Sequence, residues 1–364
     1  MSATGAGLIG RHAGLWQNDR WYRLAWVVWP QAASLLVAGW VMIGGPVSVP
    51  ATREATAPWA KPIDISKLGA ETDALRNQAE SDPQALQRLE QLANGGSAMA
   101  QFAVATLYDP DLKLGKLTAP DVNMAIAWYE KSAAQNHSVA EQNLGVKYYE
   151  GRWVPVDYAK AIFWFKKAAA QNNRVAERFM GLINEDGRGV PINHTYALQW
   201  FKRAADSGDV IGEVKIGDAY WFGNGFAKSP AEGLNWYRKA AAQGNAYAQM
   251  RIGEAYLNGN GIERDLEQAF AFFQKGANNG NAMAQFYLGT MYDQGLATPI
   301  DPAQAFEWFK KGAENGNADA QNAVGLDYAR GRGVNRDYGA ARAWLEKAER
   351  NGNTAAAHNL RTLR

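Results

Sequence analysis

Residues 138–173 read SVAEQNLGVKYYEGRWVPVDYAKAIFWFKKAAAQNN, and this stretch decides the fold. In its first half, Ala140, Leu144 and Tyr148 recur at every fourth position, which places them on one stripe of an α-helix. A glycine then ends the helix, and a second amphipathic segment runs from Asp157 to the end of the stretch. The stretch therefore predicts two helices joined by a turn.

The same pattern recurs along the chain with a constant step of 36 residues. Three sets of positions repeat in phase. Large aromatic residues, which we assign to the core between units, occupy Trp128, Trp164, Trp200, Trp236, Phe272, Trp308 and Trp344. Small residues that allow close helix approach occupy Gly145, Gly181, Gly217, Gly253, Gly289 and Gly325, and second helices begin at Asp121, Asp157, Asn193, Ser229, Asp265, Asp301 and Asp337. Such registered sets indicate a tandem array whose stacked neighbours bury the apolar face that one helix pair cannot bury alone.

The repeated unit resembles the SEL-1-like repeat, a relative of the tetratricopeptide repeat. The strings that carry the resemblance are EQNLGVKYYEGR with AIFWFKKAAAQ, and AQNAVGLDYARGRGV with ARAWLEKAE, and the match covers roughly residues 98–364. The resemblance implies an all-α, right-handed α-solenoid of about seven helix-turn-helix repeats that serves as a protein-interaction scaffold.

Composition excludes several classes of function. A net charge of +2 with 20% charged residues argues against a dedicated nucleic-acid binder. The absence of cysteine excludes disulfides, thiolate zinc sites and cysteine nucleophiles.

An uncharged apolar run at residues 24–49, LAWVVWPQAASLLVAGWVMIGGPVSV, is long enough to cross a membrane, which takes about 20 residues. Residues 1–23 before it carry three arginines, so the positive-inside rule places residues 1–20 in the cytoplasm and the repeats in the periplasm of a bacterial-type inner membrane. A cleaved signal peptide is the alternative, but Val49-Pro50-Ala51 is a poor cleavage site. The opposite topology, with cytoplasmic repeats, also stays open.

The remaining boundaries follow from composition and register. Residues 50–66 contain three prolines and predict a partly stiff linker. Residues 67–97 predict a degenerate half-repeat that caps the array, with Arg88 in the aromatic slot, and Arg361 in a glycine slot marks the C-terminal cap of the solenoid at residues 98–364. The loop between Tyr108 and Asp121 is four residues longer than its equivalents, and insertions of this kind are either tolerated slack or partner sites.

Two polar sets have structural explanations. Asp, Asn and Ser share the slot that begins each second helix, which fits an N-cap and not a catalytic carboxylate. A basic residue follows each aromatic slot by three positions, and there its stem covers the unit interface or, alternatively, the cations form a track for an acidic polymer. This basic set is Lys131, Lys167, Arg203, Lys239, Lys275, Lys311 and Lys347.

No catalytic, cofactor-binding or metal-binding constellation is visible in the sequence. The four histidines lack ligand spacing, and the Gly-x-Gly pairs precede helices without a preceding strand, so they indicate turns. We therefore predict that the chain is not an enzyme and needs no cofactor.

The informative positions are those on the first helices that do not repeat. They lie opposite the packing stripe and predict a groove for an extended segment or helix of another protein. The predicted groove residues are Gln142, Tyr149, Arg178, Glu185, Asp218, Trp221, Tyr247, Met250, Glu254 and Phe286. The expected function is a membrane-anchored scaffold for an envelope complex in signalling, envelope assembly or exopolysaccharide export. Alternatives are polysaccharide binding by the aromatic groove and basic set and, less favoured, a hydrolase.

Overall fold

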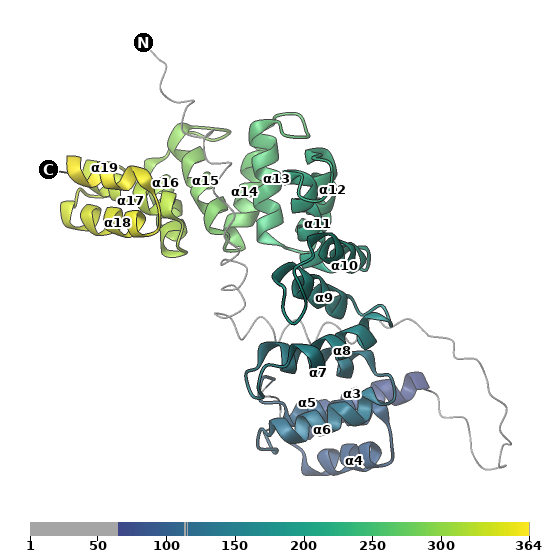
Figure 1. Ribbon diagram of the computed structural model, residues 1–364. Helices are drawn as coiled ribbons and strands as arrows, with labels where there is room; N and C mark the ends of the chain where they lie inside the picture. The colour runs from purple at the N-terminus through teal and green to yellow at the C-terminus, as the bar shows by residue number, and fades with distance from the viewer. Residues whose placement is uncertain (1–64, 113, 115, 364) are drawn as a thin grey trace.

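The computed structural model describes residues 65–112, 114 and 116–363, and within them it contains 17 helices and no strand. The helices are α3 (Ile65–Ala79), α4 (Pro83–Asn94), α5 (Ala98–Tyr108), α6 (Val122–Ala133), α7 (Ser138–Glu150), α8 (Tyr158–Ala169), α9 (Arg174–Asp186), α10 (His194–Asp206), α11 (Val210–Phe222), α12 (Pro230–Ala242), α13 (Ala246–Asn258), α14 (Leu266–Asn278), α15 (Ala282–Gln294), α16 (Pro302–Glu314), α17 (Ala318–Arg330), α18 (Tyr338–Arg350) and α19 (Thr354–Thr362). Figure 1 shows them stacked in chain order into an elongated, curved array.

Seven helix pairs, from α5–α6 to α17–α18, form the array, and each helix packs most closely on its neighbours in the chain. The predicted helical repeat solenoid is therefore confirmed. Residues 67–97, predicted as a half-repeat cap, contain most of α3 and all of α4, so a helix pair precedes α5. In the described residues no helix is long and apolar enough to cross a membrane, and the predicted span at 24–49 lies outside them.

Local side-chain chemistry sets the helix ends. Each second helix begins at the predicted cap position, where, for example, the Asp157 side chain accepts a hydrogen bond from the Lys160 amide at 3.0 Å. Asn193 and Ser229 do the same for α10 and α12. The first helices α7 to α17 end at glycines with φ of 67 to 80°, a left-handed conformation that glycine adopts without strain.

The core of each unit lies one residue beyond the predicted aromatic set. Trp128 and Trp236 are buried, but Trp164, Trp200, Phe272, Trp308 and Trp344 are only half-buried. The fully or almost fully buried side chains follow them directly: Tyr129, Phe165, Phe201, Tyr237, Phe273, Phe309 and Leu345. A side chain added at the repeating glycine would overlap these residues, since a Cβ on Gly145 would lie 2.5 Å from the Phe165 ring. Glycine at these positions therefore allows the two helices of a unit to pack closely against the buried side chain between them.

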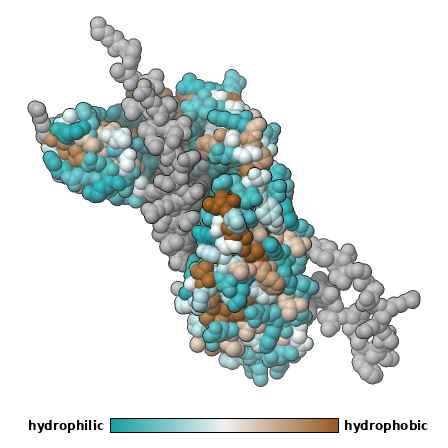
Figure 2. All heavy atoms as spheres, in the orientation of Figure 1, coloured by the Kyte–Doolittle hydropathy of each residue, from teal (hydrophilic) through white to brown (hydrophobic). Residues whose placement is uncertain are grey.

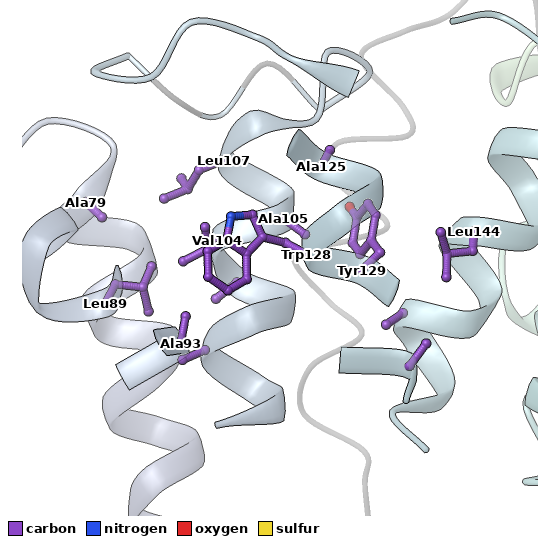
Figure 3. Packing of buried hydrophobic residues seen from close by; sticks show 14 of the residues in the cluster. Ala79, Leu89, Ala93, Val104, Ala105, Leu107, Ala125, Trp128, Tyr129 and Leu144 are labelled. Carbon is purple, nitrogen blue, oxygen red and sulfur yellow. The ribbon is translucent and has the colours of Figure 1, made fainter. Parts of the chain in front are cut away.

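Figure 3 shows how the adjacent residues Trp128 and Tyr129 pack in the first unit. Trp128 points toward Val104 and Ala105 of α5, whereas Tyr129 points toward the side of α6 on which Leu144 lies. Adjacent helical residues differ by about 100° in direction, so Trp128 packs against α5 of its own unit while Tyr129 is turned toward α7 of the next unit.

The basic set lies on the aromatic set throughout. In every unit the cation lies 3.7 to 5.3 Å from the centroid of the ring three positions earlier, with Lys131 over Trp128 and Lys239 over Trp236 among the closest. Cation–π attraction of this kind contributes about 0.5–1 kcal/mol at exposed sites. This geometry supports the structural explanation, in which the cations and their stems cover the unit interfaces.

Candidate partner surface

The predicted groove residues lie on the first helices α7, α9, α11, α13 and α15, which succeed one another along the array. We call this the first-helix face. Figure 2 shows larger hydrophobic areas on the visible surface over the N-terminal half of the array than over its C-terminal end, which is mostly hydrophilic.

A polar cluster occupies the centre of this face. Asp218 on α11 accepts hydrogen bonds from the hydroxyls of Tyr237 at 2.6 Å and Tyr247 at 2.9 Å. Arg251 on α13 donates from Nε to the Tyr247 oxygen at 2.8 Å and from Nη1 to Glu254 at 2.7 Å. Burial raises the pKa of Asp218, while Arg251 and the two hydroxyls oppose that rise. The cluster is therefore a hydrogen-bonded unit whose side chains are fixed in place before any partner arrives.

A second ion pair extends the cluster toward the N-terminus. Lys215 on α11 lies 2.7 Å from Glu185 on α9, so residues of two successive units are joined across the face. Arg178, two turns earlier on α9, pairs instead with Asp209, the N-cap residue of α11, at 2.9 Å. Arg178 therefore pairs with the residue that caps the N-terminus of α11, and it is less available to a partner than the sequence predicts.

Two of the predicted groove residues are in the core. Trp221 is 7% exposed and packs with Tyr237 and Ile252, and Met250 is 5% exposed and packs with Phe273 and Leu288. The prediction that they line a groove is wrong, because the turn of the array brings the next unit over these two side chains. Trp221 and Met250 thus stabilise unit stacking.

The other aromatic and amide positions are half-buried. Tyr149 packs edge-on against Phe179 at 5.0 Å between ring centroids, and Phe286 lies 5.8 Å from Phe309. Gln142 donates to Asn143 at 3.3 Å. These side chains present part of their surface on the first-helix face and use the rest for packing.

Sequence reasoning missed one position in each unit of this face. Phe179, Lys215, Arg251 and Tyr287 are equivalent, each one residue after the slot of Gln142. Lys215 and Arg251 supply the cations of the polar cluster, whereas Phe179 and Tyr287 stack on the buried rings of Phe165 and Phe273. The residue types at this position vary from unit to unit as much as those at the predicted slot, and this variation could have identified the position from the sequence.

The described part of the chain shows no candidate metal site, and His137 has a structural role there. It holds no group of three or more histidine, aspartate and glutamate residues able to bind a metal ion. His137 is the N-cap of α7, where its Nδ1 accepts from the Ala140 amide at 3.2 Å. Burial lowers the pKa of His137 to about 4, which keeps the ring neutral and able to accept.

Repeated helix pairs, in-phase caps and a varied face define a helical repeat protein of the solenoid class. The Sel1 repeat matches the chain at residues 98–137, 138–173, 174–209, 211–245, 246–281, 282–317 and 318–353, so the chain belongs to the Sel1 repeat family.

Two solved structures show the same relationship. One is c5321, a protective antigen present in uropathogenic Escherichia coli strains and displaying an SLR fold, with 32% identity and a TM-score of 0.70 over 80% of this chain and 63% of that protein. This chain thus matches less than two thirds of that protein's length. The other is a Sel1 repeat protein from Oxalobacter formigenes, with 29% identity and a TM-score of 0.61 over 87% of this chain and 98% of that protein. Comparison with curated proteins found no match.

Proposed function

We propose that this chain is a membrane-anchored scaffold that binds another protein on its first-helix face and supports or regulates a bacterial envelope complex. Sel1 repeat proteins generally mediate protein–protein interaction, which supports the general role. The anchor at residues 24–49, the periplasmic location of the repeats and the envelope complex are the specific parts of the proposal, and they rest on the sequence pattern.

The observation that carries the proposal is the contrast between positions within one repeat. Core and cap positions repeat in every unit, whereas the first-helix face changes from unit to unit and holds the preorganised polar cluster. The side chains of this face are held in place, and their types differ from unit to unit. Such a face can bind one partner selectively, because little side-chain conformational entropy is lost on binding.

Site-specific cross-linking tests the binding face. The chain contains no cysteine, so Gln142→Cys places a single thiol on the face outside the polar cluster, and Glu307→Cys on the exposed surface of α16 is the matched control. With a photoreactive group on each thiol in cells that express the full chain, we expect a discrete cross-linked protein from position 142 and none from position 307. The same cross-links from both positions would refute the assignment of this face.

Location is tested separately by labelling Glu307→Cys with a membrane-impermeant maleimide. Labelling once the outer membrane is opened, with the inner membrane intact, would support periplasmic repeats. Labelling only after the inner membrane is disrupted would refute them and direct the partner search to the cytoplasm.

Polysaccharide binding has less support from the geometry. Trp221, which the aromatic groove needs, is buried, and each cation of the basic set already lies over a ring. A hydrolase has no supporting observation, since the matching family is an interaction fold and not a catalytic one.

A further inference from the structure

Exposed large hydrophobic side chains are distributed unevenly along the solenoid. Of the 11 in the described residues, eight lie between residues 117 and 196, in the first three units, although seven units share the same architecture. Large exposed apolar areas on a soluble surface mark interaction sites. The N-terminal units therefore expose more large apolar side chains than the later units do.

Most of these side chains lie on one edge of the array. This edge consists of the loops that precede the second helices and the first two turns of those helices. A Cβ on Gly189, in one such loop, would lie 2.6 Å from Cβ of Tyr158, the first residue of α8, so the loop of one unit rests on the second helix of the unit before. In the first three units, the exposed members on this edge are Leu117, Met124, Trp153, Val156, Phe163, Ile192 and Tyr196.

Trp153 is held in an exposed position by the longer loop between Tyr108 and Asp121. The slot of Trp153 contains glycine in four of the later units, where the loop packs down on the preceding helix. In this unit the indole Nε1 instead donates to Asp111 at 2.8 Å, and Asp111 is ion-paired with Lys147. The ring remains 54% exposed. The longer loop thus supplies the carboxylate that binds the Trp153 indole, and the indole ring is exposed at the surface.

The chemistry of the edge fits a lipid surface. Tryptophan and tyrosine are the residues that gather at the membrane–water interface, since each combines an apolar ring with a polar group. The basic residues nearby are largely compensated, with Arg152 2.9 Å from Glu150 and Lys160 3.7 Å from Asp157. Apolar contact and not charge is therefore the main attraction.

The anchor of the proposed function would bring the same end of the solenoid to the bilayer. Fifteen residues, 50–64, separate the predicted span from the start of α3, and they reach at most about 54 Å when fully extended. A short tether keeps the first units at a high local concentration near the membrane, whereas the later units lie farther along the array.

We propose that the loop edge of the first three units rests on the phospholipid bilayer, with Trp153, Phe163 and Tyr196 inserted at the interface. The proposal rests on the membrane anchor of the proposed function. Its consequence is orientation: docking on this edge would fix how the first-helix face is presented to a partner.

Depth measurement by electron paramagnetic resonance tests this inference. Single cysteines at Phe163→Cys and, as the matched control, Tyr338→Cys carry a nitroxide in the full chain, which is reconstituted in phosphatidylcholine–phosphatidylglycerol vesicles. Tyr338 is also exposed but lies in the last unit. We expect the label at 163 to collide more with oxygen and several-fold less with a water-soluble nickel complex, and the label at 338 to stay aqueous.

The outcomes separate this inference from the proposed anchor. If the chain floats with the vesicles but the label at 163 stays aqueous, the docking inference fails and the anchor stands. If the label is shielded from both oxygen and nickel, the edge contacts protein and the inference also fails. If the chain does not float, both the anchor and the docking fail.

Discussion

Lys147 offers the sharpest test of how the longer loop is held. Its ammonium group is ion-paired with Asp109 and Asp111, and the side chains of Lys147 and Asp109 are only 5% and 3% exposed. Asp109 also accepts a hydrogen bond from the Tyr129 hydroxyl at 3.0 Å. Lys147→Met keeps the packing volume but removes the charge.

The expected cost comes mainly from the charge that the substitution leaves behind. Removing one partner of a buried ion pair destabilises a protein by about 3–5 kcal/mol, because the other charge stays buried without compensation. The loss of the second ion pair, with Asp111, adds at most about 1 kcal/mol to this cost, since the Asp111 side chain is partly exposed and water screens its charge. We therefore expect Lys147→Met to lower the free energy of unfolding of the N-terminal units by about 3–5 kcal/mol.

Hydrogen exchange measured by mass spectrometry is the assay, because the units of a solenoid unfold semi-independently. Faster exchange should appear in α5 to α7, while α13 to α18 should keep their protection. The double variant Asp109→Asn with Lys147→Met should be more stable than Lys147→Met alone, since the uncompensated charge is gone. A loss below about 1 kcal/mol in Lys147→Met, or no recovery in the double variant, would refute this reasoning.

Three further substitutions test the backbone, the core and a titrating carboxyl group. Ala297 has a φ of 57° where four other units have glycine, so Ala297→Gly should stabilise the chain by about 1 kcal/mol in urea unfolding, and a loss would contradict the inferred strain. Phe273→Ala should cost about 3–5 kcal/mol and Phe272→Ala clearly less, because only Phe273 is fully buried, and equal costs would refute the placement of the core. Burial, and then the nearby Asp293 carboxylate, raise the pKa of Asp327 from 3.8 to about 7, so the native state binds this proton more tightly and stability is lost as the pH rises from about 4 to 7. Asp327→Asn should therefore raise the melting temperature at pH 8 and change it little at pH 4, and an equal effect at both pH values would exclude this mechanism.

The sequence by itself determined the repeat and its helix boundaries. A step of 36 residues, a capping residue before each second helix and a glycine after each first helix are local signals, since each acts on amides within one or two turns of its own position. For that reason the helix pairs and the role of Asp157 and its equivalents were predicted correctly.

Only the tertiary structure decided which of two adjacent side chains is core. Trp164 and Phe165 are both large and apolar, but they point about 100° apart, and the contact with Gly145 selects Phe165. The burial of Trp221 and Met250 depends in the same way on how the next unit rotates over them.

The coupling of distant positions also needed the fold. Asp111 meets Lys147 and Trp153 across 36 and 42 residues of sequence, and Asp218 meets Tyr247 across 29. The repeat period specifies which units are neighbours, but hydrogen bonds form only where rotation and loop length bring polar atoms within about 3 Å. The sequence therefore determined the array, and the stacking of its units determined the polar cluster and the exposed edge.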